Sequence, residues 1–228
     1  MRTVRPVAHI YNDFTEKFGI PRQSGLVPEI ISRIVPEKEF ASPDAFRGIE
    51  EFSHLWLLWD FSENGSENKA LTVRPPRLGG NTRVGVFATR SPFRPNGIGL
   101  SSVKLEKVIT DKPELLVSGA DLLSGTPIFD IKPYIPYTDS HPDAKGGFAD
   151  KVMGYHLKVI FENGTEAVLG SKAESVKKIL EQDPRPSYQT DETRLYSVAF
   201  GGFDIKFTVS KGILRVKEII SVANNRDI

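Results

Sequence analysis

The sequence predicts a mainly β fold of the barrel or sandwich type, followed by a small α+β domain. Short apolar or β-branched segments recur through the first half of the chain, and Pro, Gly, Asn or Asp bounds each of them. No long helices separate these segments, which argues against a doubly wound α/β sheet. A chain of 228 residues can hold one large domain, or one domain with a smaller appendage.

Strands are expected along the N-terminal part. The segments with this pattern are Val4–Ile10, Glu29–Val35, His54–Phe61, Arg83–Ala88, Leu100–Val108 and Glu114–Ala120. Between the second and the third, Ser42 and Pro43 precede Asp44–Glu50. A side-chain cap followed by proline at the first helical position predicts a short helix there.

A domain boundary is expected near His141–Asp150, a stretch of turn composition with little to bury. Beyond it, Asn163-Gly164 separates Tyr155–Phe161 from Thr165–Leu169, which is a strong hairpin signal.

One helix and three strands are expected in the rest of this C-terminal unit. Ser171 and Glu174 have the spacing of a capping box, so a helix should run from there to about Gln182. The expected strands are Arg194–Ala199, Phe203–Ser210 and Gly212–Ile220, with Gly201-Gly202 joining the first two.

Composition is that of an ordinary soluble globular protein, with 39% apolar and 26% charged residues. The absence of cysteine excludes disulfides and thiolate chemistry. The four histidines lack metal-ligand spacing, so we expect no metal centre. The N-terminus lacks a signal-peptide core, and no apolar run approaches roughly 18 residues. We therefore expect a cytoplasmic protein without a membrane segment.

Positive charge is concentrated in one window, from Lys69 to Leu105. The protein has formal net charge +1, but this window contains no Asp or Glu and carries +7, which leaves −6 for the remainder. Its cations are Lys69, Arg74, Arg77, Arg83, Arg90, Arg94 and Lys104. Many charge runs are only solvated faces, but arginines interleaved with Phe87 and Phe93 suit phosphates, so the window predicts a phosphate-bearing partner.

Within that window, Asn96-Gly97-Ile98-Gly99 has only a superficial likeness to a dinucleotide-binding loop. The third glycine is missing, and the following residues alternate like a strand, so no helix N-terminus is expected to hold a pyrophosphate. We expect the glycines to permit a tight turn and a close approach of the backbone to a ligand.

The apolar run Phe52–Phe61 contains His54, Trp56 and Trp59. A histidine in such a run is most often buried with its hydrogen bonds satisfied, so we expect this of His54. The same reasoning places Trp56 and Trp59 in the core or in an interface, and not on a base-stacking platform.

The segment Asp130–Ser140 combines charged, aromatic and proline residues. If it is extended, Asp130, Lys132 and Tyr134 share one face. Its prolines lack backbone donors, so the segment fits an edge or the wall of a cleft better than a central strand. An ion-paired edge strand and a functional segment are equally compatible with this pattern.

Together these motifs resemble the TsaA/TrmO-like tRNA adenine N6-methyltransferases, which use S-adenosylmethionine. The resemblance covers nearly the whole chain. Its blocks are Pro21–Leu26, Phe46–Glu50, Phe52–Trp56, Val73–Gly80, Arg83–Ser101, Asp121–Asp139 and Glu181–Tyr188. Gly97 departs from the family, in which many members have proline after Arg-Pro-Asn; glycine loosens the loop but removes no reactive group.

The resemblance implies a β-barrel domain over residues 1–145 that binds S-adenosylmethionine, a small α+β domain over residues 146–228, and a homodimer. It implies methylation of N6 of threonylcarbamoyladenosine beside the anticodon of threonine tRNAs. The sequence agrees with an unusual methyltransferase fold, because it has no Gly-rich loop after the first strand and no Asp-Pro-Pro-Tyr box.

For this implied activity, Asp121 or a nearby carbonyl is expected to favour the sulfonium charge. The residues assigned to the cofactor are Gln23, Ser24, Gly25, Phe61, Ser62, Arg90, Gly99, Leu100, Asp121, Leu122 and Ser124. Arginine can bind phosphate or the threonyl carboxylate with two parallel hydrogen bonds. The residues assigned to tRNA are Arg74, Arg77, Arg90, Arg94, Asn96 and Lys132.

Adenine N6 is a poor nucleophile because its lone pair is delocalised into the ring, and in the threonylcarbamoyl base it also belongs to a urea. Methyl transfer is an in-line displacement that depends on positioning, and a group that accepts the N6 proton would assist it. Asp130 and Asp139 are the candidate acceptors, and Tyr134 is the candidate orienting or stacking group.

Two other functions remain open on the sequence. The barrel could be a non-catalytic RNA-binding or interaction module with the basic face but no cofactor pocket, or a methyltransferase with a different acceptor. Binding of S-adenosylmethionine would count against the first, and the acid-free window favours nucleic acid over a small molecule.

Overall fold

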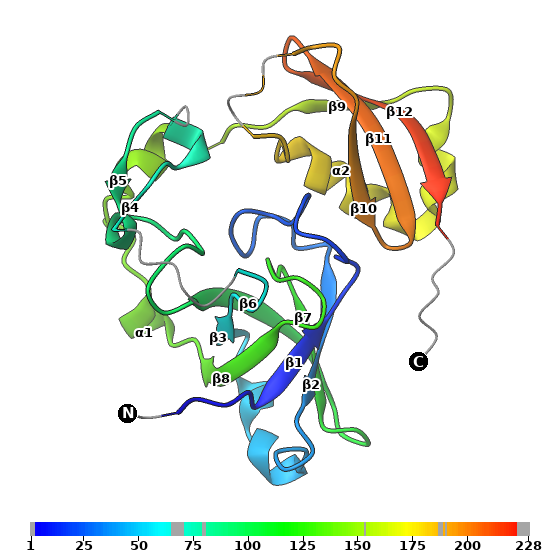
Figure 1. The fold of residues 1–228 in the computed structure, drawn as a ribbon. Helices are drawn as coiled ribbons and strands as arrows, with labels where there is room; N and C mark the ends of the chain where they lie inside the picture. Colours follow the sequence, from blue (N-terminus) through cyan, green and yellow to red (C-terminus); the bar gives the residue numbers. More distant parts are fainter. Residues whose placement is uncertain are drawn as a thin grey trace.

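The computed structural model of the chain describes residues 3–64, 71–78, 81–152, 154–186, 189 and 191–222. Antiparallel strands close a barrel in the order β1-β2-β7-β6-β3-β8 (Figure 1). They are β1 (Ala8–Tyr11), β2 (Ile31–Pro36), β3 (His54–Asp60), β6 (Ile98–Ile109), β7 (Glu114–Ser118) and β8 (Pro127–Pro133). The mainly β class is confirmed, and the first domain is a barrel and not a sandwich.

Alternating side chains fill the barrel. On β3, Leu55, Leu57 and Trp59 are buried, whereas His54 is exposed and Trp56 is half-buried on the outer face. Inward side chains of the other strands join the same core. Each fully buried aliphatic side chain of this kind stabilises the fold by about 1.5–3 kcal/mol.

Three long connections meet at one end of the barrel, because β1, β3 and β7 all run toward it. They span residues 12–30, 61–97 and 119–126, and we call this the loop end. The connection 61–97 carries β4 (Thr72–Val73), η3 (Pro76–Leu78), β5 (Val84–Gly85) and η4 (Val86–Ala88). The strand predicted over Arg83–Ala88 is therefore correct only for Val84 and Gly85; a 3-10 turn follows.

At the opposite end, β2 leads into two short 3-10 helices, η1 (Pro43–Phe46) and η2 (Ile49–Glu51). The predicted cap is confirmed, since the Asp44 N–H donates to Ser42 Oγ at 3.3 Å. Gly48 divides the predicted helix in two, because its φ of 84° is left-handed.

Strand β8, which closes the barrel, contains only the first four residues of the proline-containing segment Asp130–Ser140. It pairs with β3 as far as Pro133, but its register with β1 covers only Pro127 and Ile128. In the described part of the sheet, Asp130–Pro133 thus has a strand on one side only, which confirms the expected edge position. The short helices α1 (Pro136–Asp139) and η5 (Gly147–Val152) follow.

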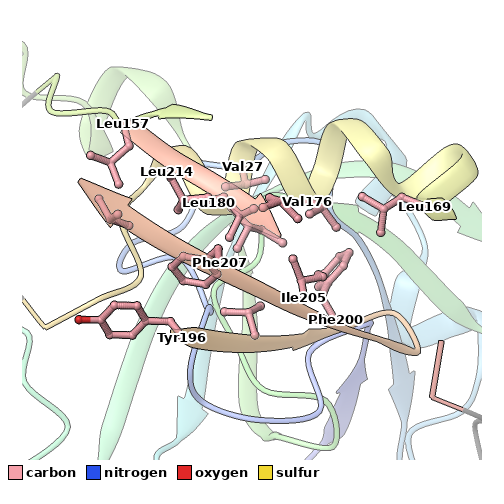
Figure 2. Close-up of a cluster of buried hydrophobic side chains, with 14 of the residues drawn as sticks. Val27, Leu157, Leu169, Val176, Leu180, Tyr196, Phe200, Ile205, Phe207 and Leu214 are labelled. Carbon is pink, nitrogen blue, oxygen red and sulfur yellow. The ribbon is translucent and has the colours of Figure 1, made fainter. Parts of the chain in front are cut away.

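A second, four-stranded sheet has the order β10-β11-β12-β9. Its strands are β9 (Lys158–Phe161), β10 (Tyr196–Phe200), β11 (Phe203–Ser210) and β12 (Ile213–Ser221), and between β9 and β10 lie η6 (Thr165–Lys172) and α2 (Ala173–Glu181). Val176, Ile179 and Leu180 of α2 are buried in a core with β10–β12 (Figure 2). The predicted helix and the last three predicted strands are confirmed.

Two local predictions in this region are wrong. Asn163 and Gly164 have the positive φ values of a tight turn, 53° and 71°, but η6 follows instead of a returning strand, and β9 pairs in parallel with β12. The capping box also fails, because Lys172 occupies the N-cap of α2 without a side-chain cap. A kink at Gly170 places Ser171 inside the turn that leads into α2.

The connection 12–30 of the barrel belongs to the core of the second sheet. Phe14, Val27 and Ile30 are buried in the same cluster as α2 and β10–β12, and Figure 2 shows Val27 among those side chains. Gly19 lies so close to Val198 that a Cβ would approach Cγ1 to 2.9 Å. The two sheets are therefore joined by packing as well as by the linker after α1.

Candidate functional site

The loop end brings together residues of the candidate cofactor site from distant parts of the sequence. Gly25 donates its N–H to Gly119 O at 2.8 Å, and the Ser102 N–H donates to Ser24 Oγ at 3.2 Å. A Cβ at Gly119 would approach the Gly25 backbone to 3.2 Å, so glycine permits this close contact. The connections 12–30 and 119–126 thus meet beside β6.

A hydrogen-bonded chain joins Trp59, Ser101 and Asp121 beneath these connections. Trp59 Nε1–H donates to Ser101 Oγ at 2.9 Å, and the Ser101 hydroxyl donates to Asp121 Oδ1 at 2.5 Å. Burial raises the pKa of the Asp121 carboxyl above its ordinary value, while hydrogen bonds from Ser101 and from the Ser24 N–H oppose the rise. Carboxyls perturbed in this way are common at binding and catalytic sites.

Gly99 of the Asn96–Gly99 block has a packing role that the sequence did not predict. Gly99 lies within β6, and a Cβ there would be 2.2 Å from Trp59 Cε2. The indole ring therefore occupies the space on the Cβ side of Gly99, so this glycine makes room for Trp59, and its expected approach to a ligand stays a prediction. β6 confirms that a strand, and not a helix, follows the block.

Arg90 and Arg94 have different surroundings. An Arg90 Nη1–H donates to Gln23 Oε1, and the Arg90 charge acts on Asp121. Arg94 turns back on its own loop, where Nη1 donates to Thr89 O at 3.0 Å. Arg90 therefore reaches the loop end, and Arg94 shapes the connection that carries it.

The remaining cofactor candidates offer different groups. Ser124 Oγ accepts the Asn12 N–H at 3.2 Å. Leu122 is fully buried in the barrel core, and its carbonyl accepts from Asn12 Nδ2 at 2.9 Å. Phe61 packs on Trp59 with ring centroids 4.3 Å apart. The cofactor candidates Ser62 and Leu100 are exposed at this end, and so are the tRNA candidates Arg74 and Asn96.

The residues assigned to catalysis lie elsewhere, on the outer face of the barrel. The Ile135 N–H and Trp56 Nε1–H donate to Asp139 Oδ2 at 3.0 and 2.8 Å, and these bonds hold the pKa of Asp139 below its ordinary value. The rings of Tyr134 and Trp56 have centroids 5.4 Å apart. We call Trp56, Tyr134 and Asp139 the outer cluster.

The structure keeps the outer cluster away from the loop end of the same chain. Trp56 and Trp59 are three residues apart on β3, hence about 10 Å apart along the strand and on opposite faces. Asp130 forms an ion pair with Lys132 at 2.7 Å. His54, expected to be buried, is exposed, because it alternates with inward-facing Leu55.

Other features of the described residues do not add to this site. A hollow of about 290 Å³ at the opposite end of the barrel is lined by Glu50–Ser53 and Leu105–Val108, and its glutamates disfavour a polyanion. No described helix has the length and apolarity to cross a bilayer, and the described acidic and histidine side chains form no metal-binding group. Lys69 and the Arg77 side chain lie outside the described residues.

Two family models match the two regions that the sheets define. The model of the tRNA-methyltransferase O N-terminal domain matches residues 9–140, and that of the TrmO C-terminal domain matches residues 155–222. The chain belongs to the tRNA-methyltransferase O family. The resemblance drawn from the sequence blocks is thereby confirmed.

Two bacterial relatives in the tRNA-methyltransferase O family match along most of their length. The Escherichia coli K12 protein named tRNA (adenine(37)-N6)-methyltransferase is 39% identical over 212 residues, covering 88% of this chain and 90% of that protein. A Pseudomonas aeruginosa PAO1 protein named putative S-adenosylmethionine-dependent methyltransferase RcsF is 40% identical, covering 95% and 97%. The crystal structure of TrmO from Pseudomonas aeruginosa has a TM-score of 0.79 at 33% identity, covering 96% and 98%.

For this tRNA-methyltransferase O family member, sequence reasoning missed Ser101 and Arg22. Ser101 is buried, and strand alternation after Gly99 would have placed its hydroxyl inside the barrel. Arg22 Nη2 donates to Arg185 O at 2.9 Å. This contact joins the barrel connection 12–30 to the turn between α2 and β10, and no local pattern indicates it.

Proposed function

We propose that this protein is an S-adenosylmethionine-dependent tRNA methyltransferase acting on N6 of adenine 37, and that its acceptor is the threonylcarbamoylated base in threonine tRNAs. The observation that carries the proposal is the loop end, where Arg90 and the perturbed Asp121 carboxyl meet within a chain of this family. Relatives 39% and 41% identical bear the name tRNA (adenine(37)-N6)-methyltransferase.

The proposed cofactor residues are Asp121, Ser24, Gln23 and Arg90, with backbone groups of the connection 119–126. S-adenosylmethionine supplies a methyl group on a positively charged sulfur. A carboxyl of low solvent exposure suits such a cation, because attraction between opposite charges is stronger where water is excluded. A cation beside Asp121 would favour its ionised form, against the burial that raises its pKa.

The proposed tRNA surface is the basic window around the loop end. Arg74 and Arg90 are exposed there. The sequence from Lys69 to Leu105, which contains both, has no acidic residue. A guanidinium can hold a phosphate or the threonyl carboxylate through two parallel hydrogen bonds. Binding through phosphates should weaken as salt is added.

Asp130 is the proposed acceptor of the N6 proton. Asp139 is a weaker base than the sequence alone implied, since two N–H donors hold its pKa low. We propose that Asp139 orients Trp56 and that Tyr134 offers a stacking surface for the acceptor base. Lys132, beside Asp130, would then face the tRNA backbone.

We further propose a cytoplasmic homodimer in which Asp130 and the outer cluster of one copy serve the loop end of the other. Leu71, Phe87 and Phe93 expose 76%, 79% and 47% of their surface, an apolar area that a second copy would cover. Mixed subunits of Arg90→Ala and Asp130→Ala should then recover activity that neither variant has alone. A monomer by sedimentation, or no recovery on mixing, would refute this arrangement.

The decisive experiment is nucleoside mass spectrometry on threonine tRNA incubated with the protein, with and without S-adenosylmethionine. A cofactor-dependent gain of one methyl on threonylcarbamoyladenosine supports reaction, substrate and cofactor together. No gain on tRNA that carries the modification rejects the acceptor if the cofactor still binds. If the cofactor does not bind either, a non-catalytic RNA-binding module becomes the better interpretation.

A further inference from the structure

We propose that Arg22 is a positioning residue through which the C-terminal sheet domain holds the cofactor segment of the barrel in place. This inference rests on the proposed function. Arg22 Nη2 donates to Arg185 O at 2.9 Å and to Asp183 O at 3.5 Å. The connection 12–30, to which Arg22 belongs, runs between the barrel and α2 in Figure 1.

The two residues after Arg22 both contact the candidate cofactor site. Gln23 accepts a hydrogen bond from Arg90. Ser24 accepts the Ser102 N–H at 3.2 Å, and its backbone N–H lowers the pKa of the Asp121 carboxyl. Three consecutive residues therefore connect the C-terminal domain, the basic window and the perturbed carboxyl.

The turn that receives Arg22 is rigid. Asp183 has a left-handed φ of 51°, and its carboxylate accepts Arg185 Nε and Nη2 at 2.8 and 3.0 Å and the Tyr155 hydroxyl at 3.1 Å. The Asp183 and Arg185 side chains expose only 13% and 14% of their surface, and two prolines flank Arg185. Paired Arg–carboxylate bonds fix geometry, so the carbonyls are preorganised for Arg22.

The segment on either side of Arg22 is also anchored to the C-terminal domain. Gly19 packs against Val198, and Val27 and Ile30 are buried in the C-terminal core. Gly25 has a left-handed φ of 79°, at which the backbone can pivot with little steric resistance. Arg22 thus adds a polar contact directly before Gln23 and Ser24, between two apolar anchors.

The test uses the full-length protein and the variants Arg22→Ala, Arg22→Lys and Arg194→Ala. Calorimetric titration with S-adenosylmethionine should show a loss of about 5- to 10-fold in affinity for Arg22→Ala, the effect of one hydrogen bond of ordinary strength. Arg22→Lys should recover part of it, since an ammonium can still donate to a carbonyl. Arg194→Ala is the control, because it removes an equal charge from the C-terminal domain. The Arg194 guanidinium carbon lies 5.3 Å from the centroid of the Tyr196 ring, and its loss should leave the affinity for S-adenosylmethionine unchanged.

Hydrogen exchange gives a readout that does not need the cofactor. Backbone amides of residues 23–25 should exchange faster in Arg22→Ala than in wild type or Arg194→Ala, with the core of β11 unaffected. Unchanged exchange and unchanged cofactor affinity in Arg22→Ala would overturn the inference while the proposed function stands. If Arg22→Ala exchanges faster but the wild-type protein binds no S-adenosylmethionine, the proposed function is rejected. The contact made by Arg22 would then position the segment without serving a cofactor site.

A double-mutant cycle separates positioning from general stability. Asp183→Ala removes the acceptor that holds Arg185 in the turn, so its effect on affinity should overlap with that of Arg22→Ala. The double variant should then lose less than the product of the two single losses. Fully independent losses would show that Arg22 does not act through this turn.

Discussion

Trp59 and Trp56 lie on the same strand, and each directs its indole N–H toward a carboxyl group in a different environment. Trp59 reaches Asp121 through Ser101, and burial raises the pKa of that carboxyl. Trp56 binds Asp139 directly on the outer face, where N–H donors lower its pKa. The comparison teaches that the side of the strand on which each indole lies, and not residue type, decides whether its carboxyl partner has a raised or a lowered pKa.

The largest effect on this comparison should come from Gly99→Ala. A Cβ at this position would lie 2.2 Å from the Trp59 ring, so the ring or β6 must move. We expect a loss of about 3 kcal/mol in the free energy of unfolding, measured by urea denaturation. Gly97→Ala is the control, since its Cβ would meet nothing closer than 3.6 Å. Equal losses for both variants would show that contact with Trp59 is not the cause.

Asp121→Asn should separate function from stability. The amide keeps an oxygen for the Ser101 hydroxyl but lacks the charge, so affinity for S-adenosylmethionine should fall about 10-fold or more. The melting temperature at pH 7 should stay level or rise, because no charge is desolvated on folding. Asp139→Asn should do the reverse, lowering the melting temperature with little change in cofactor affinity. A cofactor affinity that is equal in wild type and Asp121→Asn would exclude Asp121 from the site.

Removal of each indole donor should give a smaller and unequal effect. Trp59→Phe leaves the buried Ser101 hydroxyl without its donor and opens space in the core, for a loss of about 1–2 kcal/mol on unfolding. Trp56→Phe acts at a solvent-accessible carboxylate and should cost less. Urea denaturation of both variants measures the two losses in the free energy of unfolding. A larger loss for Trp56→Phe than for Trp59→Phe would contradict the expected order.

The smallest effects should appear in the pH dependence of stability, with opposite signs. The raised pKa of Asp121 means that its protonated form favours folding, so wild type should lose stability relative to Asp121→Asn as pH rises from 3.8 through the folded pKa. The lowered pKa of Asp139 means that its contribution is present above 3.8 and is lost as pH falls through the folded pKa. Urea titrations across the acid range would test both, and slopes of the same sign would contradict the comparison.

Local patterns predicted most strands of this protein but not the arrangement of its site. Alternation in the run from His54 to Trp59 is sufficient to place β3. The same alternation puts His54 on the outer face, whereas the apolar composition of the run wrongly predicted a buried histidine. Asn163-Gly164 predicted the turn, because its backbone angles are local, but not the helix after it, because parallel pairing of β9 with β12 is not local.

The candidate site depends on contacts between residues far apart in the sequence. Ser24 meets Ser102, and Arg22 meets Arg185, across separations of 78 and 163 residues. Arg22, Ser24 and Arg185 lie in blocks recognised through family resemblance, and Ser102 directly follows one, but their contacts follow from barrel closure and from the shared core. No period or spacing within a single segment contains that information.

The burial of Phe14, Val27 and Ile30 in the C-terminal core has a consequence for biosynthesis. These side chains leave the ribosome early, whereas β10, β11 and β12, which cover them, are made last. A nascent chain can close most of the barrel, yet its first connection stays uncovered until the C-terminal sheet is complete. A chain interrupted before that point would therefore expose these apolar residues to chaperones and proteases. The same segment positions Gln23 and Ser24 in the complete protein, so we expect prematurely terminated copies to be degraded preferentially.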